Sequence, residues 1–63
     1  MRSDIKALRK GAGLRQEDLA ERVGVSRQTI IAIENNKYNP TLELAMKLAK
    51  ELGKIVEDIF FLE

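Results

Sequence analysis

Glycine and proline divide this chain into short segments, and this division limits the folds that it can adopt. Pro40 is the single proline, and glycine stands at positions 11, 13, 24 and 53. Between these breaks the apolar residues recur at the three- to four-residue spacing of helices that bury one side, with no long strict alternation. The sequence therefore predicts an all-α fold, a compact orthogonal bundle of five short helices in one domain over residues 1–63.

Each predicted helix has neighbours that favour starting or stopping there. Ser3, Ser26 and Thr41 precede three of the helices, and their hydroxyl oxygens can accept hydrogen bonds from free backbone N–H groups. Gly24 and Gly53 follow two of them, because glycine adopts the left-handed conformation that ends many helices. The predicted helices cover about residues 4–10, 16–23, 27–35, 42–52 and 56–62. In the fourth helix the residues predicted to face the core are Leu42, Ala45, Leu48, Ala49 and Leu52.

The composition argues against several classes of function. The chain contains neither Cys nor His, which removes disulfides, the usual metal ligands and the most common general base. We therefore expect a binding protein and not an enzyme, with no cofactor, no metal and no small-molecule substrate. The longest unbroken apolar run is the four residues 59–62. No signal peptide or membrane span is expected, and the cytoplasm is the predicted location.

The junction between the second and third predicted helices, Gly24-Val25-Ser26, carries the most information about function. Glycine in the left-handed conformation turns the chain, the apolar residue is buried under the corner, and the serine caps the next helix. This pattern is typical of a helix-turn-helix, here at about residues 16–34. The third helix is then the predicted recognition helix.

A family resemblance rests on residues 13–30 (GLRQEDLAERVGVSRQTI), 33–40 (IENNKYNP) and 57–60 (EDIF). These stretches resemble the lambda-repressor-like, or XRE-type, helix-turn-helix family. The resemblance implies a small transcription regulator that binds double-stranded DNA, usually as a dimer. Three positions depart from the family pattern. Arg15 stands where Thr or Ser usually caps the second helix, Asn36 replaces a Gly, and Ile55 replaces a Ser before the last helix.

The exposed side of the recognition helix is predicted to read bases. At about 100° per residue, the residues that fall opposite the core side are Arg27, Gln28, Ile31 and Ala32. Arg reads guanine and Gln reads adenine through paired hydrogen bonds, and an apolar side chain fits a thymine methyl group. An ordinary solvated helix side is the alternative for these residues.

The residues predicted to hold the DNA backbone are Arg15, Gln16, Asn35, Lys37 and Tyr38. The resemblance implies that Gln16 binds a phosphate and braces a recognition-helix side chain such as Gln28. Arg15 is a poor cap that is well placed for the same phosphate. The loop after the recognition helix is expected to use backbone N–H groups together with Lys37 and Tyr38. Packing of Tyr38 against the fourth helix is the alternative.

Arg9 and Glu34 follow apolar residues on the inner sides of the first and third predicted helices. The family resemblance pairs them as a partly buried ion pair, and buried charges are stable only when they are paired. They are therefore predicted to stabilise the bundle and not to contact DNA.

The end of the chain, residues 55–63, is predicted to form a short helix that joins two copies. Its apolar residues are Ile59, Phe60, Phe61 and Leu62. Adjacent helical residues point about 100° apart, so the two Phe side chains cannot both enter one small core. One of them is expected to pack against a second copy in a homodimer. A terminal helix that only covers the core is the alternative.

The net charge of +1 is unevenly distributed. Residues 1–37 carry eight basic and five acidic side chains, and residues 38–63 carry three basic and five acidic ones. The positive excess therefore falls on the half with the helix-turn-helix. We predict a sequence-specific transcription regulator, a repressor that binds a palindromic operator as a dimer through the major groove. A protein-interaction or antitoxin-like module with the same fold is the alternative.

Overall fold

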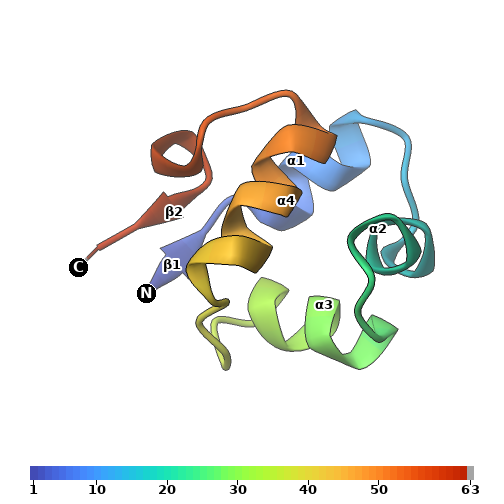
Figure 1. The fold of residues 1–63 in the computed structure, drawn as a ribbon, viewed down its shortest axis with the longest axis horizontal. Helices are drawn as coiled ribbons and strands as arrows, with labels where there is room; N and C mark the ends of the chain where they lie inside the picture. Colours follow the sequence, from blue (N-terminus) through green and yellow to red (C-terminus); the bar gives the residue numbers. More distant parts are fainter. Residues whose placement is uncertain (63) are drawn as a thin grey trace.

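The computed structural model describes residues 1–62. They form four α-helices, one turn of 3-10 helix and a two-stranded antiparallel sheet (Figure 1). In chain order the elements are β1 (Arg2–Ser3), α1 (Ile5–Gly11), α2 (Gln16–Val23), α3 (Arg27–Glu34), α4 (Leu42–Leu52), η1 (Val56–Asp58) and β2 (Phe60–Phe61). Four of the five predicted helices are confirmed and the fold is mostly helical, whereas the fifth helix is wrong and a small sheet that was not predicted is present.

The helix ends have the local geometry that the sequence predicts. The hydroxyl oxygens of Ser26 and Thr41 each accept a hydrogen bond at 3.2 Å from the backbone N–H three residues further on. Gly24 ends α2 with a φ of 75°, and Gly53 ends α4 with a φ of 67°. Both glycines therefore adopt the left-handed conformation that terminates a helix without strain.

The start of α1 differs from the prediction. Asp4 and not Ser3 precedes the helix, and the Asp4 side chain makes no capping hydrogen bond. Ser3 lies in β1 because the chain there pairs with Phe60 of β2. The Asp4 N–H donates to the carbonyl oxygen of Ile59 at 2.8 Å. This bond fixes the start of α1 to the C-terminal segment.

The C-terminal segment forms a turn and a strand where a helix was predicted. After η1, Phe60 pairs with Ser3 and Phe61 pairs with Arg2. Adjacent side chains of a strand point to opposite sides, so Phe60 is buried while Phe61 stays partly exposed, with the Arg2 guanidinium 5.1 Å from its ring centroid. The pairing brings the two ends of the chain side by side (Figure 1). Glu63, the last residue of the predicted helix region, lies outside the described residues.

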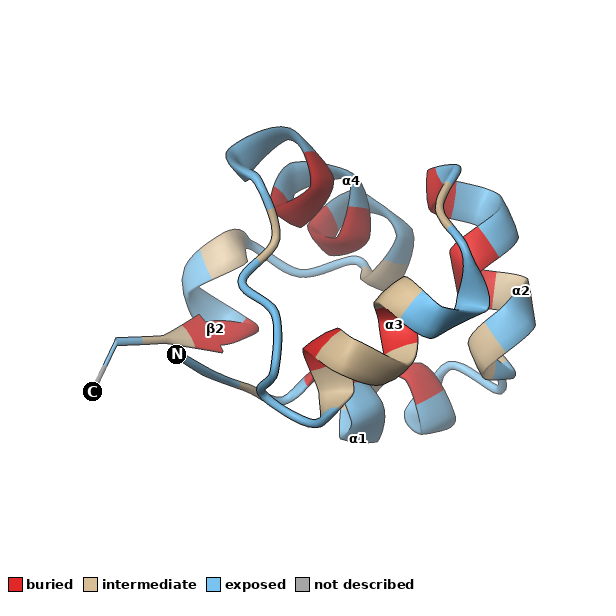
Figure 2. Cartoon of the chain, turned by 90° about the horizontal axis from the view of Figure 1, so that it is seen from below, coloured by how far each residue is buried: buried red, intermediate tan, exposed pale blue. Residues whose placement is uncertain are grey.

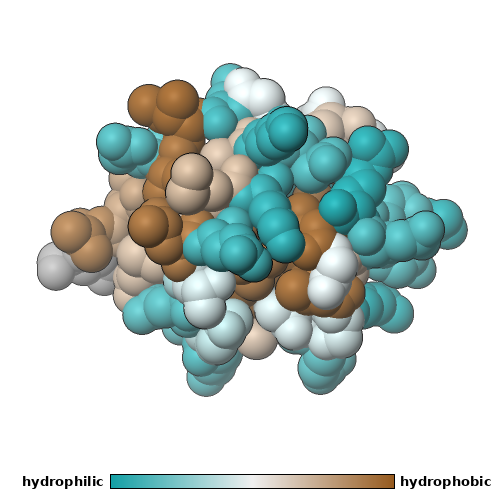
Figure 3. All heavy atoms as spheres, in the orientation of Figure 1, coloured by the Kyte–Doolittle hydropathy of each residue, from teal (hydrophilic) through white to brown (hydrophobic). Residues whose placement is uncertain are grey.

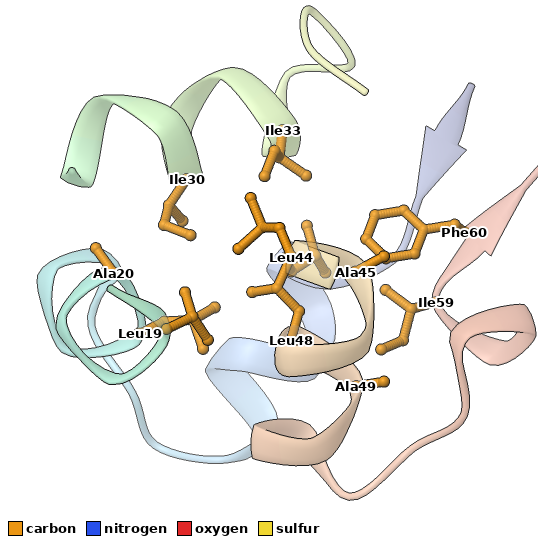
Figure 4. Packing of buried hydrophobic residues seen from close by; sticks show 12 residues of the cluster. Leu19, Ala20, Ile30, Ile33, Leu44, Ala45, Leu48, Ala49, Ile59 and Phe60 are labelled. Atoms are coloured by element: carbon orange, nitrogen blue, oxygen red, sulfur yellow. The ribbon is translucent and has the colours of Figure 1, made fainter. Parts of the chain in front are cut away.

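The hydrophobic core lies between the four helices and β2. Figure 2 shows the buried residues on the sides of α2, α3 and α4 that face the interior. In Figure 4, Ile30 and Ile33 of α3 point toward Leu44 and Leu48 of α4. The largest fully buried side chains are Ile5, Leu19, Ile30, Ile33, Leu48 and Ile59. Because all of these elements contribute to one centre, α2 and α3 are held in a fixed arrangement, and the other side of α3 faces solvent.

α4 buries the predicted side except at its start, since Ala45, Leu48 and Ala49 are buried and Leu52 packs against the core. Leu42 is 71% exposed, whereas Leu44, absent from the predicted set, is buried. Leu44 shares one side of the helix with Leu48 and Leu52 at four-residue spacing, and Leu42 shares another side with Met46. Leu42 and Leu44 point about 200° apart, so only one of them can face the core.

Candidate nucleic-acid interface

The helix-turn-helix of α2 and α3 presents one side of α3 to solvent. Arg27 and Gln28, in the first turn of α3, are exposed, and Ile31 and Ala32 are partly exposed. The structure therefore places the four predicted base-reading residues together on the side away from the core. An N-terminal turn of this helix meets base edges when such a motif enters a major groove.

Behind this surface, Arg9 of α1 and Glu34 of α3 form the ion pair implied by the family resemblance. Arg9 Nε donates to Glu34 Oε2 at 2.6 Å, and a terminal guanidinium nitrogen donates to Oε1 at 3.3 Å. The side chains are only 7% and 2% exposed. Arg9 also donates to the carbonyl oxygen of Leu14 at 2.8 Å. The pair thus joins α1, the loop after it and α3.

Gln16, the first residue of α2, connects this ion pair to the exposed surface. Its amide nitrogen donates to Glu34 Oε1 at 3.1 Å, and its amide oxygen accepts from Arg27 Nε at 3.3 Å. The recognition-helix side chain that Gln16 contacts is therefore Arg27, where the family resemblance had suggested Gln28. The result is a hydrogen-bonded chain from Arg9 through Glu34 and Gln16 to Arg27.

The environment of Glu34 favours its charged form. Burial raises the pKa of Glu34, but the hydrogen bonds from Arg9 and Gln16 and the positive charge of Arg9 outweigh burial and hold this pKa below its ordinary value. Glu34 is therefore a carboxylate at neutral pH and accepts hydrogen bonds from both neighbours.

Arg15 precedes α2 and offers no side-chain oxygen to the free N–H groups of the first turn, whereas Asp18 in that turn bonds back to Arg15. Asp18 Oδ2 accepts from the Arg15 backbone N–H at 2.8 Å and from Arg15 Nε at 3.1 Å. The hydrogen bonds from Arg15 hold the pKa of Asp18 below its ordinary value. The Arg15 side chain, 75% exposed, lies against the start of α2 near Gln16 and remains open to solvent.

The loop after α3 uses its backbone differently from the prediction. The N–H groups of Asn35, Asn36 and Lys37 donate to carbonyl oxygens of α3 at 3.0, 3.1 and 2.8 Å. These three donors are therefore occupied within the chain and are not free for phosphates. Asn36 has a φ of 57°, so it serves in the left-handed position where the family usually has glycine. The side chains of Asn35 and Lys37 remain exposed.

Tyr38 lies beside the recognition helix. It is 44% exposed. Together with Gln28, Thr29 and Ala32 it lines a shallow hollow of about 250 Å³. Tyr38 is therefore adjacent to the side of α3 that is predicted to read bases. Thr29 was not among the predicted site residues.

The tail residues predicted to join two copies divide into two groups. Ile59 and Phe60 are 0% and 9% exposed and belong to the core of a single chain, whereas Phe61 and Leu62 lie on the surface. β2 accounts for Phe60 and Phe61, whose side chains point to opposite sides of the strand, whereas Ile59 lies before the strand and Leu62 after it. Sequence reasoning missed Leu42 and Met46 of α4, which are exposed apolar residues at four-residue spacing.

Two other kinds of site were sought in residues 1–62. The described part of the chain holds no group of three Asp, Glu, His or Cys side chains arranged to bind a metal ion. None of its helices has the length and apolar character needed to cross a membrane.

Comparisons with known proteins identify the family. The helix-turn-helix family HTH_3 matches residues 5–57. An uncharacterized HTH-type transcriptional regulator of Methanocaldococcus jannaschii is 56% identical over all of this chain and 96% of its own length. The immunity repressor protein of Bacillus phage phi105 is 43% identical over 78% of this chain and 34% of its own length. The restriction-modification controller protein C.AhdI of Aeromonas hydrophila superposes with a TM-score of 0.81 at 32% identity, covering 89% of this chain and 85% of that one. The chain belongs to the XRE-type helix-turn-helix family of DNA-binding transcription regulators.

Proposed function

We propose that this protein is a cytoplasmic transcription repressor that binds a palindromic operator in double-stranded DNA as a homodimer. The observation that carries the proposal is the bracing of Arg27, at the exposed start of α3, by Gln16. A side chain held in place before binding loses less conformational freedom when it meets a base.

Arg27 and Gln28 are the proposed hydrogen-bonding readers. Gln16 accepts a hydrogen bond only from the Nε of Arg27. The two terminal guanidinium nitrogens can therefore donate to guanine O6 and N7. Gln28 is exposed one residue further on and is suited to adenine N6 and N7. Ile31 and Ala32 are proposed to contact thymine methyl groups.

The proposed contacts with the DNA backbone come from both ends of the helix-turn-helix. The amide nitrogen of Gln16 carries two hydrogens, and one of them is used by Glu34, which leaves the second for a phosphate oxygen. Arg15 lies beside it. On the other side, the proposed contacts use the side chains of Asn35, Lys37 and Tyr38, since the N–H groups of residues 35–37 are already bonded within the chain.

We propose repression because relatives of this chain include a repressor and a controller protein. A phage immunity repressor is 43% identical over 78% of this chain, and a restriction-modification controller shares the fold at 32% identity. A small domain bound at a promoter represses by occupying the DNA, which requires no further activity of the protein. Two copies related by a two-fold axis would read two half-sites about 34–36 Å apart.

Selection from random duplex DNA at a stated salt concentration tests this proposal. We expect enrichment of a palindrome, with half-site centres about one helical turn apart. The matched control is the double variant Arg27→Ala/Gln28→Ala, which should fold and lose the enrichment. If wild-type protein enriches no sequence and shows no salt-dependent DNA binding, the protein-interaction module becomes the better account.

A further inference from the structure

The outer side of α4 carries apolar side chains that its own chain leaves uncovered. Leu42 is 71% exposed and Met46 is 58% exposed. Together with Glu43, Lys47 and Lys50 they line an open groove of about 610 Å³. We call these five residues the α4 surface.

Exposed large apolar residues are concentrated in the part of the chain that follows α3. Among the described residues, the large hydrophobic side chains that are exposed are Met1, Tyr38, Leu42, Met46, Ile55 and Leu62. All except Met1 follow α3, and none lies in α1, α2 or α3. Figure 3 shows hydrophobic side chains in a column over η1, β2 and the first half of α4. A contiguous patch of this kind on a small domain marks an interaction surface.

We propose that the α4 surface binds a second copy of this chain, with the two α4 helices antiparallel about a two-fold axis near Met46. The proposal deepens the homodimer of the proposed function by naming its surface. It concerns the free protein, so it can be tested without DNA. None of the five residues belongs to α3 or to the loop after it, so the contact does not use the base-reading residues.

The charges on α4 favour the antiparallel arrangement. Glu43 stands near the start of the helix and Lys50 near its end. Antiparallel helices bring Glu43 of each copy beside Lys50 of the other, whereas parallel helices would place like charges together. The apolar stem of Lys50 can then cover the facing Leu42 while its ammonium group reaches the carboxylate. Met46 meets its own counterpart at the axis, where a flexible thioether adapts to the available space.

The area that a dimer requires indicates how far the contact extends. A stable interface covers about 800 Å² on each partner, which is about one fifth of the 4236 Å² surface of this chain. Five residues of one helix cannot supply all of it. Ile55, 60% exposed, and Leu62, 92% exposed, follow α4 in the chain and are further apolar residues that the contact can include.

Sedimentation equilibrium of the free protein tests the interface. Wild-type protein should be dimeric at high micromolar concentration, and Met46→Glu should raise the dimer dissociation constant at least about 100-fold, because the buried charge occurs twice at the axis. The matched control is Ala7→Glu, which adds the same charge at an exposed position of α1 and should leave the dimer unchanged. Circular dichroism must show that both variants remain folded.

A charge exchange tests the orientation of the helices. Lys50→Glu alone should weaken the dimer, and Glu43→Lys/Lys50→Glu should restore it, because the exchange recreates both intermolecular pairs. A monomeric wild-type protein, or a dimer that Met46→Glu leaves intact, would overturn the proposal. A monomer that still selects a DNA site would refute this interface and leave the proposed DNA binding standing. A dimer that depends on Met46 but selects no DNA would support the interface and refute the proposed function.

Discussion

Arg9 of α1 and Glu34 of α3 form a nearly buried ion pair, with Arg9 Nε 2.6 Å from Glu34 Oε2. Gln16 bonds to the same carboxylate and also to Arg27. The ion pair and Arg27, the first of the proposed base-reading residues, therefore belong to one hydrogen-bonded chain. Variants on the Arg9 side of Gln16 should change stability, and variants on the Arg27 side should change DNA binding.

Replacing Arg9 by alanine should strongly destabilise the fold, because it leaves the Glu34 carboxylate buried without its partner. Breaking a buried pair costs about 3–5 kcal/mol, and each kcal/mol shifts the melting temperature of a small domain by about 4–8 °C. We expect a drop of at least about 12 °C in a thermal melt followed by circular dichroism. Arg15→Ala, which removes an exposed pair, is the control and should shift the curve little. An unchanged melting curve for Arg9→Ala would contradict a structural role for the pair.

The stability should fall in acid through Glu34. The folded pKa of Glu34 is depressed below its ordinary value of 4.5, so its contribution is complete above about pH 4.5 and is lost as the pH falls through the folded pKa. The difference in melting temperature between wild type and Glu34→Gln should therefore be constant near neutral pH and shrink below this range. Thermal melts of both proteins across the pH series measure it. Parallel curves down to the lowest pH would contradict the assignment.

Gln16→Ala should weaken DNA binding more than it weakens the fold. The Arg9–Glu34 pair remains after this change, whereas Arg27 loses its brace and a proposed phosphate contact disappears. We expect about a tenfold loss of affinity for the selected duplex, equivalent to about 1.4 kcal/mol, measured by fluorescence anisotropy. The melting temperature serves as the control. Equal affinity of variant and wild type would show that the brace does not contribute to binding.

Lys37→Ala should reduce binding to all sequences alike. Lys37 is exposed in the loop beside Tyr38, and a lysine that contacts one phosphate releases about 0.9 counterion. The slope of log affinity against log salt concentration should therefore become shallower by about 0.9 for each bound copy. The exposed Lys54, which lies beyond α4, offers a matched control in Lys54→Ala. An unchanged slope for Lys37→Ala would place this side chain away from the DNA.

The parts of the fold that local chemistry determines could be predicted from the sequence. The cap at Ser26, the left-handed Gly24 and Asn36, and the buried side of α3 all depend on residues close together in the chain. The sheet could not be predicted in this way. Its strands are two residues long, and Phe60 forms one because Ser3, at the other end of the chain, pairs with it.

The candidate site was predictable to a similar degree. The exposed positions of Arg27 and Gln28 follow from helical spacing, and the Arg9–Glu34 pair was implied by the family resemblance. The partner of Gln16 was not predictable, because the positions of residues 27 and 28 relative to α2 depend on how the two helices cross. The internal bonds of the loop N–H groups depend likewise on the path of the chain after α3.

The ratio of dissociation constants for the selected duplex and a scrambled duplex, at the same physiological salt concentration, tests the central claim most directly. The account predicts a ratio of at least about 10³ for wild-type protein. Gln28→Ala should reduce this ratio by at least about 5-fold for each half-site, since one good base contact contributes about 1–3 kcal/mol of discrimination. A wild-type ratio near one, or a ratio that Gln28→Ala leaves unchanged, would contradict sequence reading by this side of α3.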